Sequence, residues 1–344
     1  MFRIANERGN EGRNIVLQIV RWFLLFCALT GAPVLAHAQN PQAYPDRPVR
    51  LVVAFPPGGA TDTFIRQITQ ELKDALGQSV VIENRPGAGG YIAWNHVASS
   101  DPDGYTLLVA ENAIGISQAL YKKHASNFDP LKQYDSIALV GNSPLVVVAA
   151  NNTNVNTFAE LVAYSRSLQQ KMNYASAGTG SVSHLVFEVI KDGTGMEAVH
   201  VPYKGGGPAI ADVIAGHVSV VVSAISVGKS VIEAGKVKGL AVTSLERSPA
   251  LPNVPSLKEA GAKMADVDLR FWWGIFGPKG IPDAVKAKIE KAFATVMADR
   301  TVRERLANLD IMPEFAPGNA LQVKLENEIT NWSKFIDQKG IKVE

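Results

Sequence analysis

The stretch that most constrains the fold runs from Val49 to Asp62 and reads VRLVVAFPPGGATD. Its first half is a nearly unbroken run of β-branched and apolar residues, which is typical of a strand covered on both faces. Pro56 and Pro57 end this strand because proline cannot donate to a sheet ladder. The following residues have the apolar spacing of an amphipathic helix that ends at Gly77. The stretch therefore predicts a strand, a sharp turn and a helix.

The turn itself is a candidate binding site. Gly58 and Gly59 allow a tight bend and a close approach to another group, and Thr61 or Asp62 is placed to cap the next helix. Such a turn leaves unpaired N–H groups at the positive end of a helix dipole, which favours an anionic ligand. Taken alone, the same sequence is equally consistent with an ordinary strand-to-helix loop.

Three further glycine-rich turns follow predicted strands and precede predicted helices: Pro86 to Gly90, Gly178 to Ser181, and Gly205 to Gly207. None satisfies a nucleotide-binding fingerprint, because the first two lack the third glycine at Rossmann spacing and the last lacks the P-loop lysine. We therefore expect no nucleotide cofactor. Together the four turns predict sets of backbone N–H groups that converge on one anion.

The N-terminus has the three regions of a secretory signal peptide. Four arginines precede the apolar run from Trp22 to Leu29, and Ala36, His37 and Ala38 precede Gln39. We expect residues 1–38 to be a signal peptide that is cleaved after Ala38, so that the protein is periplasmic. A membrane anchor is the alternative, but the apolar run is short for a span and is broken by glycine and proline.

Removal of residues 1–38 would take four arginines and two glutamates from the 34 basic and 32 acidic residues, so the exported chain would be formally neutral. This charge argues against a nucleic-acid partner. Cys27 is the only cysteine and would also be removed, which excludes a disulfide or a catalytic thiol. The histidines show no paired ligand spacing, so we expect no metal site.

Strand and helix signals alternate along the chain, which indicates α/β layers with largely parallel sheets. The polar break from Gly141 to Pro144 and the proline-rich segment from Ser244 to Pro255 are the predicted crossings between two lobes. Lobe 1 would comprise residues 39–140 and 244–344, and lobe 2 residues 141–243. Ligands usually bind in the cleft between two such lobes.

Ser181 and His184 raise the possibility of a secreted serine hydrolase. At this spacing the two side chains share one helix face, but an orienting acid and the G-x-S-x-G elbow are absent. We interpret Ser181 as the N-cap of the helix and a donor to a carboxylate.

Six collinear blocks, among them YPDRPVRLVVAFPPGGATD, GQSVVIENRPGAGGYIA, DPDGYTLLVA and VPYKGGGPAIADVIAGHV, span nearly all of the predicted mature chain. In these blocks the sequence resembles the Bug family of extracytoplasmic solute-binding receptors of tripartite tricarboxylate transporters. The resemblance implies a two-lobed Venus-flytrap fold of periplasmic-binding-protein type II, in which each lobe is a mainly parallel sheet flanked by helices. It also implies carboxylate binding without catalysis, and membrane permease subunits as partners.

The resemblance further implies ligand contacts from the turns of both lobes. Where many members carry an acid after a G-x-V-D motif, this chain has Ser219 and Ser223, which argues against an amino-acid ligand. We thus expect a monomeric receptor for a small aliphatic or aromatic mono- or dicarboxylate. A ligand sensor that signals to a partner protein is the alternative. The expected ligand-binding residues are Phe55, Pro57, Gly58, Gly59, Thr61, Asp62, Gly87, Ala88, Gly89, Gly178, Thr179, Gly180, Ser181, His184, Tyr203, Lys204, Gly205 and Ser223.

Overall fold

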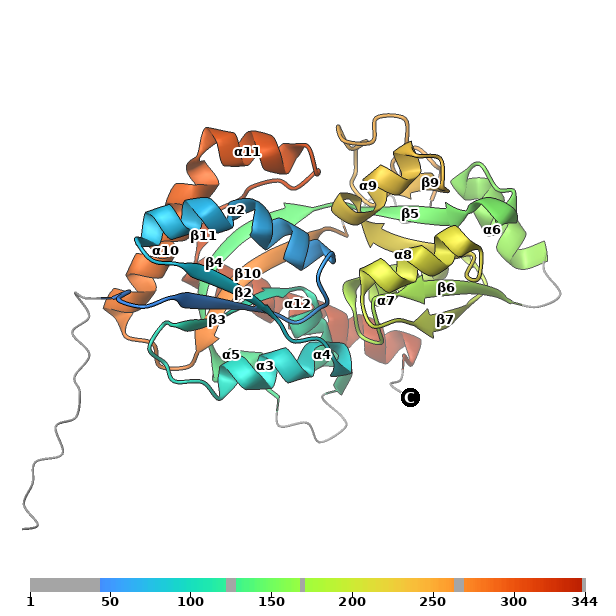
Figure 1. The fold of residues 1–344 in the computed structure, drawn as a ribbon. Coiled ribbons are helices and arrows are strands. Elements are labelled where there is room, and N and C mark those ends of the chain that lie inside the picture. The colour runs from blue at the N-terminus through green and yellow to red at the C-terminus, as the bar shows by residue number, and fades with distance from the viewer. Residues whose placement is uncertain (1–43, 122–127, 168–170, 263–268, 342–344) are drawn as a thin grey trace, which may run out of the picture. The chain divides into compact units, whose positions relative to one another are not determined.

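The computed structural model describes residues 44–121, 128–167, 171–262 and 269–341. The predicted signal peptide lies outside these residues. Within them, the strands form one six-stranded and one five-stranded sheet, and helices flank both (Figure 1). None of the helices in these four ranges has the length and apolar character needed to cross a membrane.

The first sheet has the strand order β11-β4-β10-β3-β1-β2. β1 is parallel to both β2 and β3, whereas β10 is antiparallel to β3 and β4. Its strands are β1 (Val49–Val53), β2 (Val80–Asn84), β3 (Thr106–Glu111), β4 (Tyr134–Ser143), β10 (Phe271–Pro278) and β11 (Ala316–Pro317). The helices before or after these strands in the chain are α2 (Ala60–Leu76), η1 (Ala88–Gly90), α3 (Tyr91–Ala98), α4 (Ala113–Tyr121), α5 (Pro130–Gln133), α10 (Asp283–Ala298), α11 (Arg300–Ala307) and α12 (Gly318–Lys339).

The second sheet has the order β7-β6-β8-β5-β9. β6 is parallel to β7 and β8, and β5 is antiparallel to β8 and β9. Its strands are β5 (Leu145–Ala150), β6 (Met172–Ser176), β7 (Ala198–Pro202), β8 (Val220–Ala224) and β9 (Val237–Val242). The helices of this part are η2 (Asn151–Thr153), α6 (Phe158–Ser167), α7 (Val182–Thr194), α8 (Gly206–Ala215) and α9 (Ile225–Glu233).

The two sheets are mixed rather than mainly parallel, because the strands that link them run against their neighbours. β4 leads into β5 across Pro144, and β10 returns the chain to the first sheet (Figure 1). The polar residues Asn142 and Ser143 were predicted to lie in a break, but they are buried at the end of β4 and pair with β10. Polar residues therefore do not indicate a loop here, since pairing within the sheet satisfies the hydrogen-bonding groups of the backbone. The lobe boundaries at residues 141 and 244 stay a prediction.

The predicted strand and helix around the first glycine turn are confirmed. In β1 every residue except Arg50 is buried, as expected for a strand that lies between two others. Helix α2 buries Phe64, Ile65, Ile68 and Leu72 completely. Phe64 stacks on Trp273 of β10 with ring centroids 4.6 Å apart. The helix ends at Gly77, which has the left-handed φ of 71°.

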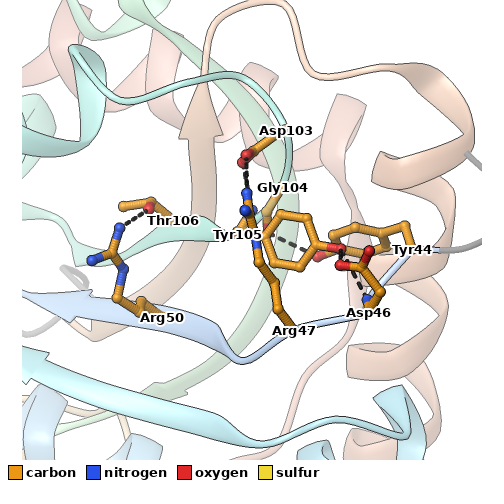
Figure 2. A network of polar contacts seen from close by, with 8 residues as sticks. All are labelled: Tyr44, Asp46, Arg47, Arg50, Asp103, Gly104, Tyr105 and Thr106. Atoms are coloured by element: carbon orange, nitrogen blue, oxygen red, sulfur yellow. Dashed lines mark hydrogen bonds and ion pairs between the residues drawn. The ribbon is translucent and has the colours of Figure 1, made fainter. Parts of the chain in front are cut away.

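Polar contacts anchor the chain just before β1 (Figure 2). The Tyr44 hydroxyl donates to the carbonyl of Gly104 at 2.8 Å, and the Tyr105 hydroxyl donates to Asp46 Oδ1 at 2.6 Å. The guanidinium of Arg47 lies 4.2 Å from the centroid of the Tyr105 ring, a cation–π geometry. These contacts join the start of β1 to the start of β3, so the C-terminal ends of both strands reach the same edge of the sheet.

Candidate functional site

A pocket lies between the two sheets, at the C-terminal ends of β1 and β3. The space between its walls, part of which is open to solvent, is about 580 Å³. The first sheet and its helices contribute Phe55, Gly59, Ala60, Thr61, Glu111 and Phe271. The second sheet and its helices contribute Leu145, Ala177, Ser181, Val182, Ser183, Gly206, Val221, Val222, Ser223, Ala224 and Val227.

Five of the expected ligand-binding residues line this pocket: Phe55, Gly59, Thr61, Ser181 and Ser223. The other thirteen do not line it but belong to the turns around it or pack behind them. They are Pro57, Gly58, Asp62, Gly87, Ala88, Gly89, Gly178, Thr179, Gly180, His184, Tyr203, Lys204 and Gly205.

Asp62 holds the first glycine turn in shape. Its carboxylate accepts hydrogen bonds from the N–H of Gly58 at 2.9 Å, from Asn84 Nδ2 at 3.0 Å and from Arg66 Nε at 2.9 Å. Burial alone would raise the pKa of Asp62, but the hydrogen bonds from Arg66, Gly58 and Asn84 outweigh it and lower the pKa. Asp62 is therefore an ionised structural residue, only 3% exposed.

Helix α2 starts without a side-chain cap. Its N-cap is Gly59, so the expectation that Thr61 or Asp62 caps the helix is wrong. The helix begins earlier than expected, and both side chains turn to other partners: Thr61 to Glu111 and Asp62 to Gly58. The absence of a side-chain cap leaves the helix terminus, part of which lines the pocket, suited to an anion.

Ser181 is the N-cap of α7, as predicted. Its Oγ accepts from the N–H of His184 at 3.4 Å and lies 3.1 Å from Ser183 Oγ. Both serines line the pocket. The first turn of α7 therefore presents two hydroxyl groups at the pocket wall.

The His184 ring packs behind this turn. Its Nδ1 accepts from the N–H of Gly180 at 3.2 Å, and the ring stacks on His200 with centroids 3.9 Å apart. Burial, together with the nearby Lys191, lowers the pKa of His184 to about 4. A neutral histidine whose Nδ1 is occupied by Gly180 is not arranged as the general base of Ser181. The geometry does not support the serine hydrolase alternative.

The four glycine turns meet in pairs at the rim. A Cβ placed on Gly89 would lie 3.2 Å from the carbonyl oxygen of Thr179, and one on Gly205 would lie 2.9 Å from Pro56 Cδ. Each pair joins a turn of the first sheet to a turn of the second. Close backbone approach across the pocket therefore explains glycine at these positions. The Tyr203 hydroxyl donates to Asp212 Oδ2 at 2.6 Å, and Lys204 is exposed.

Sequence reasoning missed Glu111 and Phe271, which both line the pocket. Glu111 is 5% exposed; burial raises its pKa to about 7, against the opposing hydrogen bond from Thr61. The sequence contained one signal for Glu111. This acidic residue directly follows the apolar run from Leu107 to Ala110 and so lies at the C-terminal end of a strand, where ligands bind in α/β sheets. Trp272 and Trp273 of β10 are both buried.

Among the described residues, the lining has one ionisable side chain, that of Glu111, and includes no lysine, arginine or histidine. Most of the remaining wall is aliphatic or aromatic. In the part of the chain that the structure describes, no group of three or more histidine, cysteine, aspartate or glutamate side chains could hold a metal ion. The pocket can therefore bind through helix termini, hydroxyl groups, one carboxyl group and apolar contact.

Two mixed sheets with flanking helices, and a pocket between glycine turns from both, define a solute-binding protein of the periplasmic binding-protein class. The family model described as "Tripartite tricarboxylate transporter family receptor" (TctC) matches residues 64–341, and the chain belongs to this family. This result confirms the resemblance noted from the sequence.

Solved structures agree with this assignment. The periplasmic binding protein BugD is 33% identical, with a TM-score of 0.82 over 88% of this chain and 100% of that one. MatC from Rhodopseudomonas palustris, solved with malate, is 33% identical, with a TM-score of 0.78 over 85% and 99% of the two chains. Rpa4515 from R. palustris, solved with adipate, is 30% identical, with a TM-score of 0.82 over 87% and 99%. Family and structural neighbours are solute-binding proteins, not enzymes.

Proposed function

We propose that this protein is an exported receptor that captures a small mono- or dicarboxylate in the pocket and delivers it to the permease subunits of a tripartite tricarboxylate transporter. One observation carries the proposal. The N-terminal ends of α2, α7 and α8 meet at the pocket, through Gly59 to Thr61, Ser181 to Ser183, and Gly206. Each terminus bears a partial positive charge of roughly half an elementary charge, so an anion is favoured without a basic side chain.

The walls between these termini suit the carbon skeleton of such a ligand. They are formed by Phe271, Leu145 and the valines of β8 and α9, which offer apolar surface but no counter-charge. The malate and adipate in the structures of MatC and Rpa4515 are dicarboxylates of this kind. An aromatic carboxylate such as nicotinate or terephthalate fits the same description.

Capture would involve closure of the two proposed lobes, residues 39–140 with 244–344 and residues 141–243. The contacts of Gly89 with Thr179 and of Gly205 with Pro56 bring the turns together across the pocket. A ligand that contacts both sides would favour this closed arrangement over an open one. The exported form would begin after Ala38 and act as a monomer that a membrane partner recognises.

The first test is a thermal-shift screen of residues 39–344 against malate, adipate, nicotinate, terephthalate and amino acids. A ligand at about 100 times its Kd adds roughly 2.7 kcal/mol of stability. We expect a shift with one class of carboxylate. No shift with any carboxylate, in protein refolded to remove carried-over ligand, would contradict the proposal.

Ser181→Ala then tests the site. The variant removes a hydroxyl at the pocket and an N-cap, and we expect weaker binding by calorimetry together with a stability loss of about 1 kcal/mol. Thr157→Ala is the matched control, because Thr157 Oγ also accepts the N–H of a residue three positions on, at the start of α6 and outside the pocket. It should lose similar stability but keep the Kd. An unchanged Kd in Ser181→Ala would exclude Ser181 as a ligand donor.

Delivery to a permease needs a separate test, because a ligand sensor would bind in the same way. Deletion of the gene should abolish uptake of the identified carboxylate, and re-expression of the receptor should restore it. Normal uptake in the deletion strain would refute the transport role and support sensing.

A further inference from the structure

Glu111 is the last residue of β3 and lines the pocket. It lies opposite Trp273 of β10 in the sheet register and is almost fully buried. Its carboxyl oxygen Oε2 is 2.5 Å from the hydroxyl of Thr61 in the first turn of α2. Glu111 is therefore adjacent to one of the helix termini that favour an anion.

The hydrogen-bond chain favours one oxygen of Glu111 as the site of a proton. The indole N–H of Trp273 can only donate, and it donates to Thr61 Oγ1 at 3.1 Å. The Thr61 hydroxyl in turn donates its single proton to Glu111 Oε2. Because Oε2 accepts this bond, Oε1 is the oxygen from which a neutral carboxyl group can donate to a ligand. Only the neutral form of Glu111 can donate a hydrogen bond.

Among the residues that the structure describes, no charged side chain compensates a negative charge on Glu111. Burial and the Thr61 hydrogen bond are the influences on its pKa, which burial raises to about 7. The ionisable groups on the elements packed around it or across the pocket already have partners or lie elsewhere. They include Asp62 with Arg66 and Glu71 with Arg305 on α2; Arg50 on β1, bonded to Thr106; His96 on α3, whose pKa burial lowers; His184, kept neutral by burial, Glu188 with Lys191, and Asp192 with Lys339 on α7; Asp212 on α8, bonded to Tyr203; and Lys229 on α9, paired with Glu233.

A carboxylate bound at the N-terminus of α2 would lie beside Thr61 and thus close to Glu111. Two negative charges in an apolar pocket without a cation repel each other strongly, and such a pair retains a proton. We propose that Glu111 is protonated in the complex, so that capture of a carboxylate takes up one proton from solvent and Glu111 donates a hydrogen bond to the ligand. This inference rests on the proposed function and makes the receptor selective for anions without an ammonium group.

The affinity should therefore fall as the pH rises. If Glu111 titrates near pH 7 in the free protein and stays protonated in the complex, the Kd should increase about 20- to 30-fold between about pH 6.5 and pH 8.5. Calorimetry with the carboxylate that gives the largest thermal shift among malate, adipate, nicotinate and terephthalate measures this change. At about pH 8.5 the binding enthalpy should also vary with the ionisation enthalpy of the buffer, with close to one proton taken up.

Glu111→Gln provides the decisive comparison, because glutamine keeps the shape and a donor group but cannot ionise. We expect it to bind the same carboxylate with little dependence on pH, and more tightly than the wild type at about pH 8.5. Glu328→Gln is the matched control. Glu328 is a partly buried glutamate whose pKa burial also raises, but it accepts from Trp272 and Trp332 outside the pocket. This control should retain the wild-type pH dependence.

Either of two results from the binding experiments would overturn the inference. A Kd that is independent of pH in the wild type, with no proton uptake, would show that Glu111 is not linked to binding. Weaker binding by Glu111→Gln at every pH, with a preference of the wild type for amino acids, would show that Glu111 pairs with a ligand cation. Both results leave the receptor function intact, whereas an absence of binding by any carboxylate at every pH would refute the proposed function as well. A carbon-13 titration of the Glu111 carboxyl group in the free protein gives a readout without ligand, and ionisation near pH 4 would also refute the inference.

Discussion

Replacement of Asp62 by asparagine should destabilise the protein by about 2–4 kcal/mol. The side chain faces only donors: Gly58 N–H, Asn84 Nδ2 and the guanidinium of Arg66. An amide has one oxygen, so whichever way it is oriented it loses one buried bond and one bond to Arg66. The buried bond to a charged acceptor contributes about 1.5–3 kcal/mol. The bond to Arg66, whose side chain is 49% exposed, is screened by water and adds about 0.5 kcal/mol.

Urea denaturation of both proteins at neutral pH measures this loss, with two spectroscopic probes to test for a single transition. Asp74→Asn on the same helix is the control, because Asp74 is an exposed residue that accepts from Gln70. It should change stability by less than about 0.5 kcal/mol. A loss below about 0.5 kcal/mol for Asp62→Asn as well would refute the view that this carboxylate holds the turn.

The Asp62→Asn substitution should also change how the stability of the protein depends on pH. Hydrogen bonds lower the pKa of Asp62 in the folded protein below its usual value of 3.8, so the unfolded chain binds a proton more readily. The stability contributed by Asp62 is therefore fully present above the unfolded pKa and is lost as the pH falls through the folded pKa. The difference between wild type and Asp62→Asn should shrink below about pH 4.

Two further predictions concern the rim and the histidine pair. Gly205→Ala should weaken carboxylate binding about tenfold, because the new Cβ would lie 2.9 Å from Pro56 Cδ and oppose the contact between the turns. Gly235→Ala is the control, since Gly235 also has a positive φ but lies in open space, and it should leave the Kd measured by calorimetry unchanged. Equal Kd values in both variants would disprove the contact. Burial lowers the pKa of His200 to about 3 and that of His184 to about 4, so the unfolded chain binds more protons and stability should decrease as the pH falls below about 6.5. His200→Phe should flatten this decrease in a melting-temperature series from about pH 7 to pH 4.5, and an identical slope in both proteins would contradict the explanation.

Local sequence was sufficient where one segment decides its own structure. The apolar run before Pro56 becomes the buried strand β1, the glycine turn leads into α2, and Ser181 caps α7. Each of these depends on backbone rules that act over a few residues, such as the missing N–H of proline or the hydroxyl of an N-cap. The four glycine turns could be identified for the same reason.

The tertiary structure decided which of these residues face the pocket and which hold the turns. Asp62 and His184 were expected to contact the ligand, but Asp62 binds Gly58 and the His184 ring accepts from Gly180. Both polar side chains lie close to the glycine turns that form the pocket, but the sequence does not show in which direction each side chain points. That direction depends on the packing of the rest of the chain.

Glu111 shows this division most clearly. The apolar residues before it are typical of a buried strand, but its role depends on Thr61, 50 residues earlier, and on Trp273, which bonds to Thr61 across 212 residues. The parallel pairing of β3 with β1 and its antiparallel pairing with β10 bring the three together. The sequence by itself determined the elements, the turns and the family resemblance. Only the pairing of distant strands decided that an acid lies buried at the pocket, because burial and like charge are properties of neighbours in space.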